Sequence, residues 1–177
     1  MTIPNLITIA RLVIVPLLIV MIVQGHYDAA FVLFVAAGLS DAADGFIARH
    51  FDMRSEFGAY LDPVADKALL VSIYVTLAVA GAIPGWLAIA VVSRDAMIVG
   101  AVLLSWIMHR PVAIKPLLVS KLNTGAQIAF AAFVLAANAF DVTVAEPVRI
   151  AMMGIVAALT VASAGAYLGG WLRHMTG

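Results

Sequence analysis

Six long apolar stretches, separated only by short polar segments, constrain this chain more than any other feature. Each is close to the ~20 residues that an α-helix needs to cross the hydrocarbon core of a membrane. Because that core holds no water, the backbone must satisfy its own hydrogen bonds, and helices are the form that such runs allow. The expected fold is therefore all-α, a polytopic membrane protein with six transmembrane helices. The stretches are Leu6–Val23, Ala29–Arg49, Asp62–Ala80, Trp86–Met108, Leu118–Phe140 and Val148–Leu172.

Composition excludes several other classes of protein. Of the 177 residues, 64% are hydrophobic and 11% are charged, whereas soluble proteins carry about 25% charged residues. The absence of cysteine excludes disulfides and thiolate metal sites. The formal net charge is zero and the basic residues are scattered, so we expect no nucleic-acid partner. No stretch resembles a linker or a repeat, and residues 1–177 are predicted to form a single domain.

Basic residues favour one orientation in the membrane. Although they are spread singly along the chain, five of the ten Lys and Arg residues lie at or near the second-to-third and fourth-to-fifth loops: Arg49, Arg54, Arg110, Lys115 and Lys121. Loops rich in Lys and Arg stay in the cytoplasm, which predicts that both termini are cytoplasmic. The first basic residue, Arg11, lies within an apolar run, which is atypical of a cleaved signal, and no transit-peptide pattern precedes that run. We therefore expect a bacterial inner (plasma) membrane protein.

Four aspartates lie within the second and third apolar stretches, where charged residues are not expected. Asp41 and Asp44 are three residues apart in the second stretch, and Asp62 and Asp66 are four apart in the third. Each pair therefore shares a helix face, and the short loop between the stretches would let the pairs meet near the inner membrane boundary. Two carboxylates ~4 Å apart repel by about 4 kcal/mol at an effective dielectric of about 20. Protonation or divalent cations would relieve that repulsion, and hard oxygen ligands favour two Mg²⁺ or Mn²⁺ ions.

A structural explanation competes for part of this cluster. Asp62 precedes Pro63, which is also typical of an N-cap followed by proline at the first helical position. Gly45, Ala48 and Gly58 would leave room for a bound nucleotide, although ordinary helix packing explains small residues equally well. All four aspartates together favour a functional site, because acidic residues within membrane spans are costly.

The aspartates belong to a longer pattern. The segments DAADGFIAR and GAYLDPVAD match D-x2-D-G-x2-A-R-x8-G-x3-D-x3-D at every fixed position. This pattern resembles the signature of the CDP-alcohol phosphatidyltransferase family, membrane enzymes of six helices. The opening NLITIAR is similar to the family's N-x-x-T-x-x-R start. The segments SRDAMIVG, VSKLNTGAQI and LTVASAGAY look most like the CMP-forming cardiolipin synthases.

The resemblance implies an activity and a role for each matched residue. The enzyme would transfer phosphatidyl from CDP-diacylglycerol to an acceptor alcohol and release CMP, at the cytoplasmic side of the membrane. Asp66 would be both a metal ligand and the general base. The other implied metal ligands are Asp41, Asp44 and Asp62, and the implied contacts of CDP-diacylglycerol are Gly45, Ala48, Arg49, Gly58, Asn5 and Thr8.

The acceptor is less constrained. The likeness to cardiolipin synthases favours phosphatidylglycerol, and glycerol 3-phosphate is the alternative. Arg94 and Lys121 are candidate contacts for the phosphate that both acceptors carry. The competing interpretations are an internal Arg94–Asp95 ion pair and a lysine that simply reaches the membrane interface, followed by a helix cap.

Two other functional classes fit the composition. A small ion-coupled transporter would also use buried acids, but it does not explain the fixed spacing of the glycines and Arg49. A membrane scaffold leaves the acids unexplained altogether. The resemblance also implies a homodimer, embedded among membrane lipids.

Overall fold

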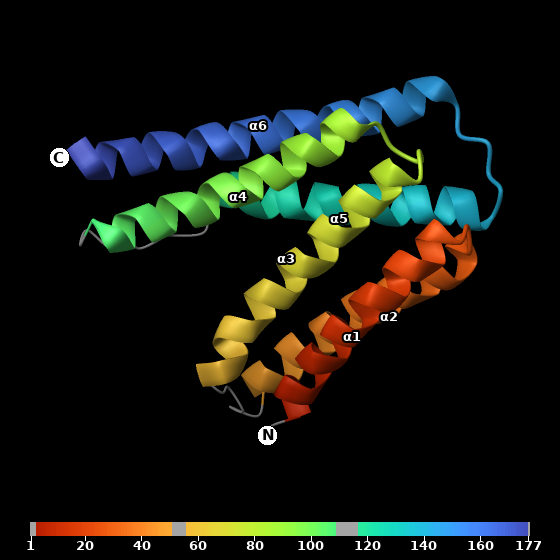
Figure 1. The fold of residues 1–177 in the computed structure, drawn as a ribbon, viewed down its shortest axis with the longest axis horizontal. Coiled ribbons are helices and arrows are strands. Elements are labelled where there is room, and N and C mark those ends of the chain that lie inside the picture. The colour runs from red at the N-terminus through yellow and green to blue at the C-terminus, as the bar shows by residue number, and fades with distance from the viewer. Residues whose placement is uncertain (1–2, 51–55, 109–116, 177) are drawn as a thin grey trace. The chain divides into compact units, whose positions relative to one another are not determined.

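The computed structural model describes residues 3–50, 56–108 and 117–176, and the side chains of residues 9–40, 65–108 and 117–175. Within these ranges, all the regular secondary structure is helical (Figure 1). Each predicted apolar stretch corresponds to one helix, which confirms the all-α fold. The helices are α1 (Ile3–Val23), α2 (Tyr27–His50), α3 (Glu56–Val79), α4 (Gly85–Ile107), α5 (Leu118–Ala139) and α6 (Glu146–Thr176).

Three of these helices have the length and apolarity of membrane spans. Among the described residues, α4, α5 and α6 meet that requirement, and α1 and α2 contribute the shorter apolar segments Ile9–Val23 and Tyr27–Ser40. Large apolar side chains such as Ile89, Trp106 and Val161 are exposed on the helices, where contact with water would be unfavourable. These surfaces suit a lipid environment. Six complete spans, and the side of the membrane on which the termini lie, stay predictions.

Two helices extend beyond their predicted spans by four or more residues at one end. The third helix begins at Glu56, six residues before Asp62, so the interpretation of Asp62 as a helix N-cap is wrong. The sixth helix runs from Glu146 to Thr176 and is 31 residues long. Apolar composition marks the part of a helix that crosses hydrocarbon, and hydrogen bonding continues the helix into its polar flanks.

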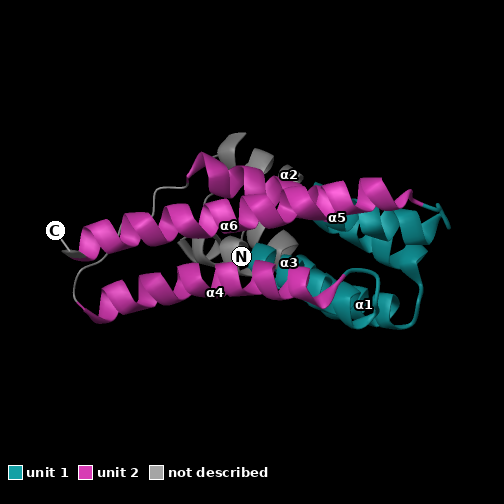
Figure 2. Cartoon of the chain, turned by 90° about the horizontal axis from the view of Figure 1, so that it is seen from above, with its two compact units in different colours: residues 1–83, 131–143 teal, residues 84–130, 144–177 magenta. Residues whose placement is uncertain are grey.

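The chain forms two compact units, drawn in separate colours in Figure 2. Unit 1 comprises residues 1–83 and 131–143, and unit 2 comprises residues 84–130 and 144–177. Helix α5 therefore contributes residues to both.

In unit 1, α1 packs against both α2 and α3. Helices α1 and α2 run antiparallel (Figure 1) and are joined by a tight turn at Gly25. The φ of Gly25 is +79°, and the amide of His26 donates to the carbonyl of Met21 at 2.9 Å. A glycine in this left-handed conformation ends a helix at low steric cost. The turn therefore fixes α1 and α2 as a hairpin.

In unit 2, α4 packs against α6, and the two helices run in the same direction (Figure 1). Apolar side chains in this unit, including Leu87, Val91, Phe130 and Val156, are at most 1% exposed. Polar residues are buried beside them on α4, α5 and α6. Buried polar groups must find partners within the protein, and these partners are described below.

Candidate active site

Asp66 pairs with a buried arginine of a different helix. Nη1 of Arg11, on α1, donates a hydrogen bond to Oδ1 of Asp66, on α3, and the two groups form an ion pair. The side chain of Arg11 is 1% exposed, whereas that of Asp66 is 48% exposed. The predicted general base is therefore anchored on one side by a buried cation and remains accessible.

Helical periodicity explains why Arg11 faces the interior of unit 1. Arg11, Val15, Leu18 and Ile22 follow one another at spacings of four, three and four residues, and all four are at most 9% exposed. Such spacing places them on one face of α1. An arginine on a buried face is costly unless a carboxylate compensates its charge.

Helix α3 has a matching stripe. Leu70, Ile73 and Leu77 follow Asp66 at spacings of four, three and four residues, and each of the three is at most 4% exposed. Asp66 is thus in helical register with the buried stripe of α3, and Arg11 lies on the buried stripe of α1. Packing of these two helices brings together residues that are 55 positions apart in the chain.

The other residues of the aspartate motif fall on helices, but their side chains lie outside the described part of the chain. Asp41 and Asp44 lie in α2 and Asp62 lies in α3, so the helical spacing on which the prediction depends is present. The convergence of the four carboxylates stays a prediction. The same holds for the predicted contacts of CDP-diacylglycerol, which are Gly45, Ala48 and Arg49 in α2, Gly58 in α3, and Asn5 and Thr8 in α1.

Metal binding is likewise untested. Among residues whose side chains are described, no group of three acidic, histidine or cysteine residues could hold a metal ion. Three of the four predicted ligands lie outside those residues. The described ligand, Asp66, offers a partly exposed carboxylate, the donor type that Mg²⁺ and Mn²⁺ prefer.

A second polar cluster lies within unit 2, around Arg94 of α4. Nη1 of Arg94 donates to Oδ1 of Asp95 at 2.5 Å, and the Arg94 guanidinium carbon lies 5.7 Å from the centre of the Tyr167 ring. Nε and Nη2 donate to Oγ of Ser163, at 3.2 and 2.6 Å, and Nη2 also donates to Oγ of Ser120. The predicted internal ion pair is confirmed. Its arginine joins α4, α5 and α6.

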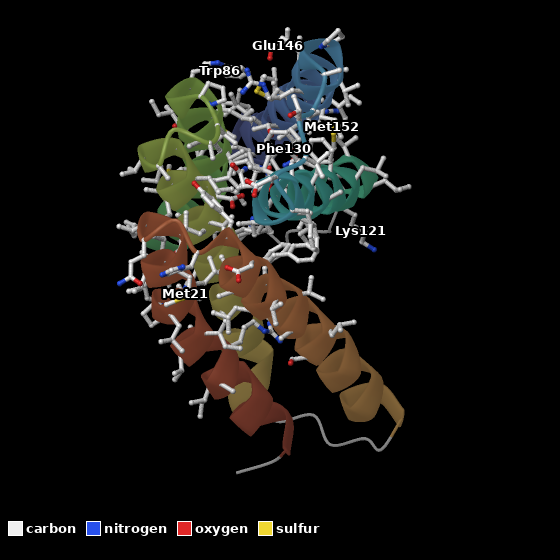
Figure 3. All side chains as sticks on the ribbon, turned by 90° about the vertical axis from the view of Figure 1, so that its right-hand side faces the viewer. Met21, Trp86, Lys121, Phe130, Glu146 and Met152 are labelled. Carbon is white, nitrogen blue, oxygen red and sulfur yellow. The ribbon has the colours of Figure 1, made fainter. Side chains whose placement is uncertain are left out.

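Lys121, the other candidate for acceptor binding, is exposed, and its side chain extends away from α5 (Figure 3). In the described part of the chain, no hydrogen bond or ion pair joins it to the Arg94 cluster. Helix α5 begins three residues earlier, at Leu118, so the residues that follow Lys121 do not form the helix cap considered from the sequence. Binding of an acceptor phosphate at Arg94 or Lys121 stays a prediction.

Polar side chains also connect α5 with α6. Oγ1 of Thr160 donates to Oδ1 of Asn123 at 2.9 Å, and Nε2 of Gln127 lies 3.4 Å from the same threonine oxygen. All three residues are at most 2% exposed. Hydrogen bonds of this kind stabilise helix packing in membranes.

Sequence reasoning assigned no chemistry to Arg11, Ser120 or Ser163. A signal for Arg11 was available, because a basic residue within an apolar span usually pairs with an acidic group of the protein. The two serines gave no comparable signal, since serine is also common at helix contacts that require only a small residue.

Comparison with known proteins identifies the family. The family model described as CDP-alcohol phosphatidyltransferase matches residues 1–162. The chain belongs to this family. The match includes Arg11, the four motif aspartates and Arg94.

The relatives include proteins named as synthases of two different lipids, cardiolipin and phosphatidylglycerophosphate. The human cardiolipin synthase (CMP-forming) is 35% identical over 158 residues, which cover 79% of this chain and 52% of that protein. A probable cardiolipin synthase (CMP-forming) of Drosophila melanogaster is 38% identical over 145 residues, covering 73% and 45%. The chain thus spans about half the length of these curated relatives. A probable phosphatidylglycerophosphate synthase of Mycobacterium tuberculosis is 32% identical over 182 aligned positions, covering 98% of this chain and 83% of the relative.

Proposed function

We propose that this protein is a divalent-metal-dependent CDP-diacylglycerol phosphatidyltransferase that forms cardiolipin from phosphatidylglycerol. The observation that carries the proposal is the family match over residues 1–162, which contains a half-exposed Asp66 held by a buried arginine. The names of the human and Drosophila relatives favour phosphatidylglycerol as acceptor. Membership of an enzyme family also removes the main reason to consider a transporter or a scaffold.

The proposed reaction is a direct displacement at phosphorus. The acceptor hydroxyl oxygen forms a bond to the β-phosphorus of CDP-diacylglycerol, and the bond from that phosphorus to the bridging oxygen breaks. CMP leaves with the bridging oxygen and the electron pair. Asp66 accepts the hydroxyl proton, since a carboxylate within reach of an attacking hydroxyl can act as general base. No covalent intermediate with the protein is needed.

Two divalent cations, Mg²⁺ or Mn²⁺, are proposed to be held by Asp41, Asp44, Asp62 and Asp66. When bound, such ions neutralise charge on a diphosphate and stabilise its leaving group. Spacings of three and four residues on α2 and α3 are compatible with two ligands from each helix. Gly45, Ala48, Arg49, Gly58, Asn5 and Thr8 are proposed to bind the CDP-diacylglycerol headgroup.

Glycerol 3-phosphate is the alternative acceptor. The specific observation in its favour is the extent of the match to the mycobacterial probable phosphatidylglycerophosphate synthase, which covers 98% of this chain. Both acceptors carry a phosphate, so a cationic site at Arg94 or Lys121 would suit either of them.

An acceptor competition tests the proposal. Purified protein in detergent micelles receives CDP-diacylglycerol, Mg²⁺ or Mn²⁺, and equal concentrations of phosphatidylglycerol and glycerol 3-phosphate. Mass spectrometry then identifies the lipid product. A product with four acyl chains is expected. A product with two acyl chains and two phosphates would replace cardiolipin synthesis by the alternative activity.

We further propose that the protein spans a bacterial inner membrane six times with both termini in the cytoplasm. Basic loops support this orientation, which places the aspartates at the cytoplasmic boundary. There the acyl chains of the substrate stay in lipid while the nucleotide faces the cytoplasm. A homodimer is proposed from the family resemblance.

A further inference from the structure

We propose that Arg11 is a positioning residue that fixes the orientation of the Asp66 carboxylate for proton transfer. The inference rests on the proposed function, in which Asp66 is the general base. It assigns a role to a residue of α1 that has no place in the aspartate motif.

Arg11 can hold another group in place because its own side chain is constrained. It is 1% exposed and lies on the α1 stripe that contains Val15 and Leu18. Closely packed interiors leave few rotamers for a side chain. A buried guanidinium also presents its donors in a planar, fixed geometry, unlike an ammonium group. The partner of Arg11 is therefore drawn to a defined position.

Asp66 needs such a constraint more than a fully buried aspartate does. Its side chain is 48% exposed, so packing restricts only part of its rotation. The ion pair engages Oδ1 and further restricts that rotation, while the exposure keeps the carboxylate within reach of an acceptor hydroxyl. A displacement of a catalytic group by about 1 Å can lower a rate roughly a hundredfold, so a fixed orientation has catalytic value.

A third ion pair, in which both side chains are exposed, serves as a comparison. Nη2 of Arg149 lies 2.8 Å from Oε2 of Glu146, and the two side chains are 48% and 61% exposed. Here neither partner is anchored, and exposed pairs of this kind hold their side chains weakly. Asp66 is as exposed as Arg149, but its partner is buried. An exposed carboxylate with a buried arginine partner supports the role of Arg11 in positioning Asp66.

The test compares steady-state kinetics of Arg11→Gln, Arg11→Lys and the wild type, with CDP-diacylglycerol as the varied substrate. For Arg11→Gln we expect kcat to fall roughly ten- to hundredfold because the base loses its alignment. KM for CDP-diacylglycerol should stay within about twofold, as expected when a group acts on the transition state with little effect on substrate binding. Arg11→Lys, which keeps the charge without the planar group, should have an intermediate kcat.

Two controls separate positioning from general destabilisation. Leu77→Ala removes a buried side chain of α3, 1% exposed, and lies about 16 Å along the helix from Asp66. It should lower the thermal midpoint without changing kcat of the folded protein. Arg149→Gln removes an exposed cation and should change neither. Equal losses of kcat in Leu77→Ala and Arg11→Gln would overturn the inference, as would an Arg11→Gln kcat within twofold of wild type.

Unfolding of the detergent-solubilised protein supplies a readout that does not depend on activity. A double-mutant cycle of Arg11→Met and Asp66→Asn should be non-additive, because the two side chains interact directly and each single change removes the same ion pair. Additive effects would contradict the inference. If Arg11→Gln does not fold, an Arg11→Lys variant with wild-type kcat would overturn it.

Failure of the proposed function has a different signature. A wild-type protein that releases no CMP with either acceptor would disprove the proposed function, and the inference about Arg11 would fall with it. Failure of the inference alone leaves wild-type turnover intact. If glycerol 3-phosphate proves to be the acceptor, the same loss of kcat is expected in that reaction.

Discussion

The two units each contain an arginine–aspartate pair with a buried arginine, and the pairs differ in how much of the aspartate is accessible. In unit 2, the side chains of Arg94 and Asp95 are 2% and 7% exposed. In unit 1, those of Arg11 and Asp66 are 1% and 48% exposed. Both pairs compensate a buried cation. Of the two carboxylates, that of Asp66 is exposed enough for another molecule to reach it.

The two arginines also differ in the other side chains that they contact. Besides pairing with Asp95, Arg94 donates to Ser120 of α5 and to Ser163 of α6 and lies against the ring of Tyr167. These contacts connect α4 to the other two helices. Arg11 lies on the buried stripe of α1, and its carboxylate partner is in helical register with the buried stripe of α3. We call Arg94–Asp95 the closed pair, because both of its side chains are buried; the other contacts of its arginine link α4 to α5 and α6. The Arg11–Asp66 pair itself joins α1 and α3 and keeps its carboxylate half-exposed, which suits it to chemistry.

Among substitutions in the two pairs, Asp66→Asn is expected to have the largest effect, a loss of kcat. An amide cannot act as a general base, and we expect kcat to fall by roughly 10²–10⁴. The amide oxygen can still accept a hydrogen bond from Arg11, but the buried Arg11 charge loses its compensation, so we also expect a lower unfolding midpoint and measure kcat on the folded protein. CMP release from CDP-diacylglycerol measures the loss, and size-exclusion chromatography checks the fold. A kcat within tenfold of wild type would remove Asp66 from the role of base.

The corresponding change in the closed pair, Asp95→Asn, should act mainly on stability. It leaves the buried charge of Arg94 uncompensated, which typically costs about 3–5 kcal/mol. Thermal or denaturant unfolding in micelles measures this loss. The kcat of the folded variant should fall far less than that of Asp66→Asn. Similar losses of kcat in both variants would mean that the two pairs do not differ in function.

A smaller effect is expected for Ser163→Ala. The change removes the hydroxyl that accepts two hydrogen bonds from the Arg94 guanidinium, and bonds to charged groups are each worth about 1.5–3 kcal/mol. Because Ser120 and Asp95 continue to bind Arg94, we expect a loss of about 2 kcal/mol in the free energy of unfolding. An unchanged unfolding midpoint would show that Ser163 does not contribute to the cross-link. Ser105→Ala, which removes the acceptor of the Trp171 indole, is a matched control outside the cluster.

Much of the fold could be predicted because each apolar stretch is long enough to specify one helix. The ends of the helices could not be predicted. Apolar residues mark the part of a helix that crosses the membrane, whereas the backbone hydrogen bonds of the helix continue into the polar residues that flank it. Glu56 to Leu61 illustrate this, because they extend α3 ahead of the Asp62–Pro63 pair that resembled a helix start.

For the site, spacing grouped Asp66 with the other three aspartates and the family resemblance implied its role as base, but neither identified its partner. Arg11 lies 55 residues away, and periodicity within a helix carries no information about which helix it packs against. The Arg94–Asp95 pair could be proposed because its residues are adjacent in the sequence. Neighbouring residues do not normally face each other on a helix, and the long arginine side chain allows this contact. Ser120 and Ser163 depend on packing between helices and were not predictable.

The central claim is that CMP is displaced at a cluster of aspartates that requires divalent cations. The most direct test is CMP release by the purified protein with CDP-diacylglycerol and acceptor, before and after exhaustive chelation. We expect release to stop when divalent ions are removed and to return when Mg²⁺ or Mn²⁺ is added. Release that continues at the same rate without divalent ions would contradict the account.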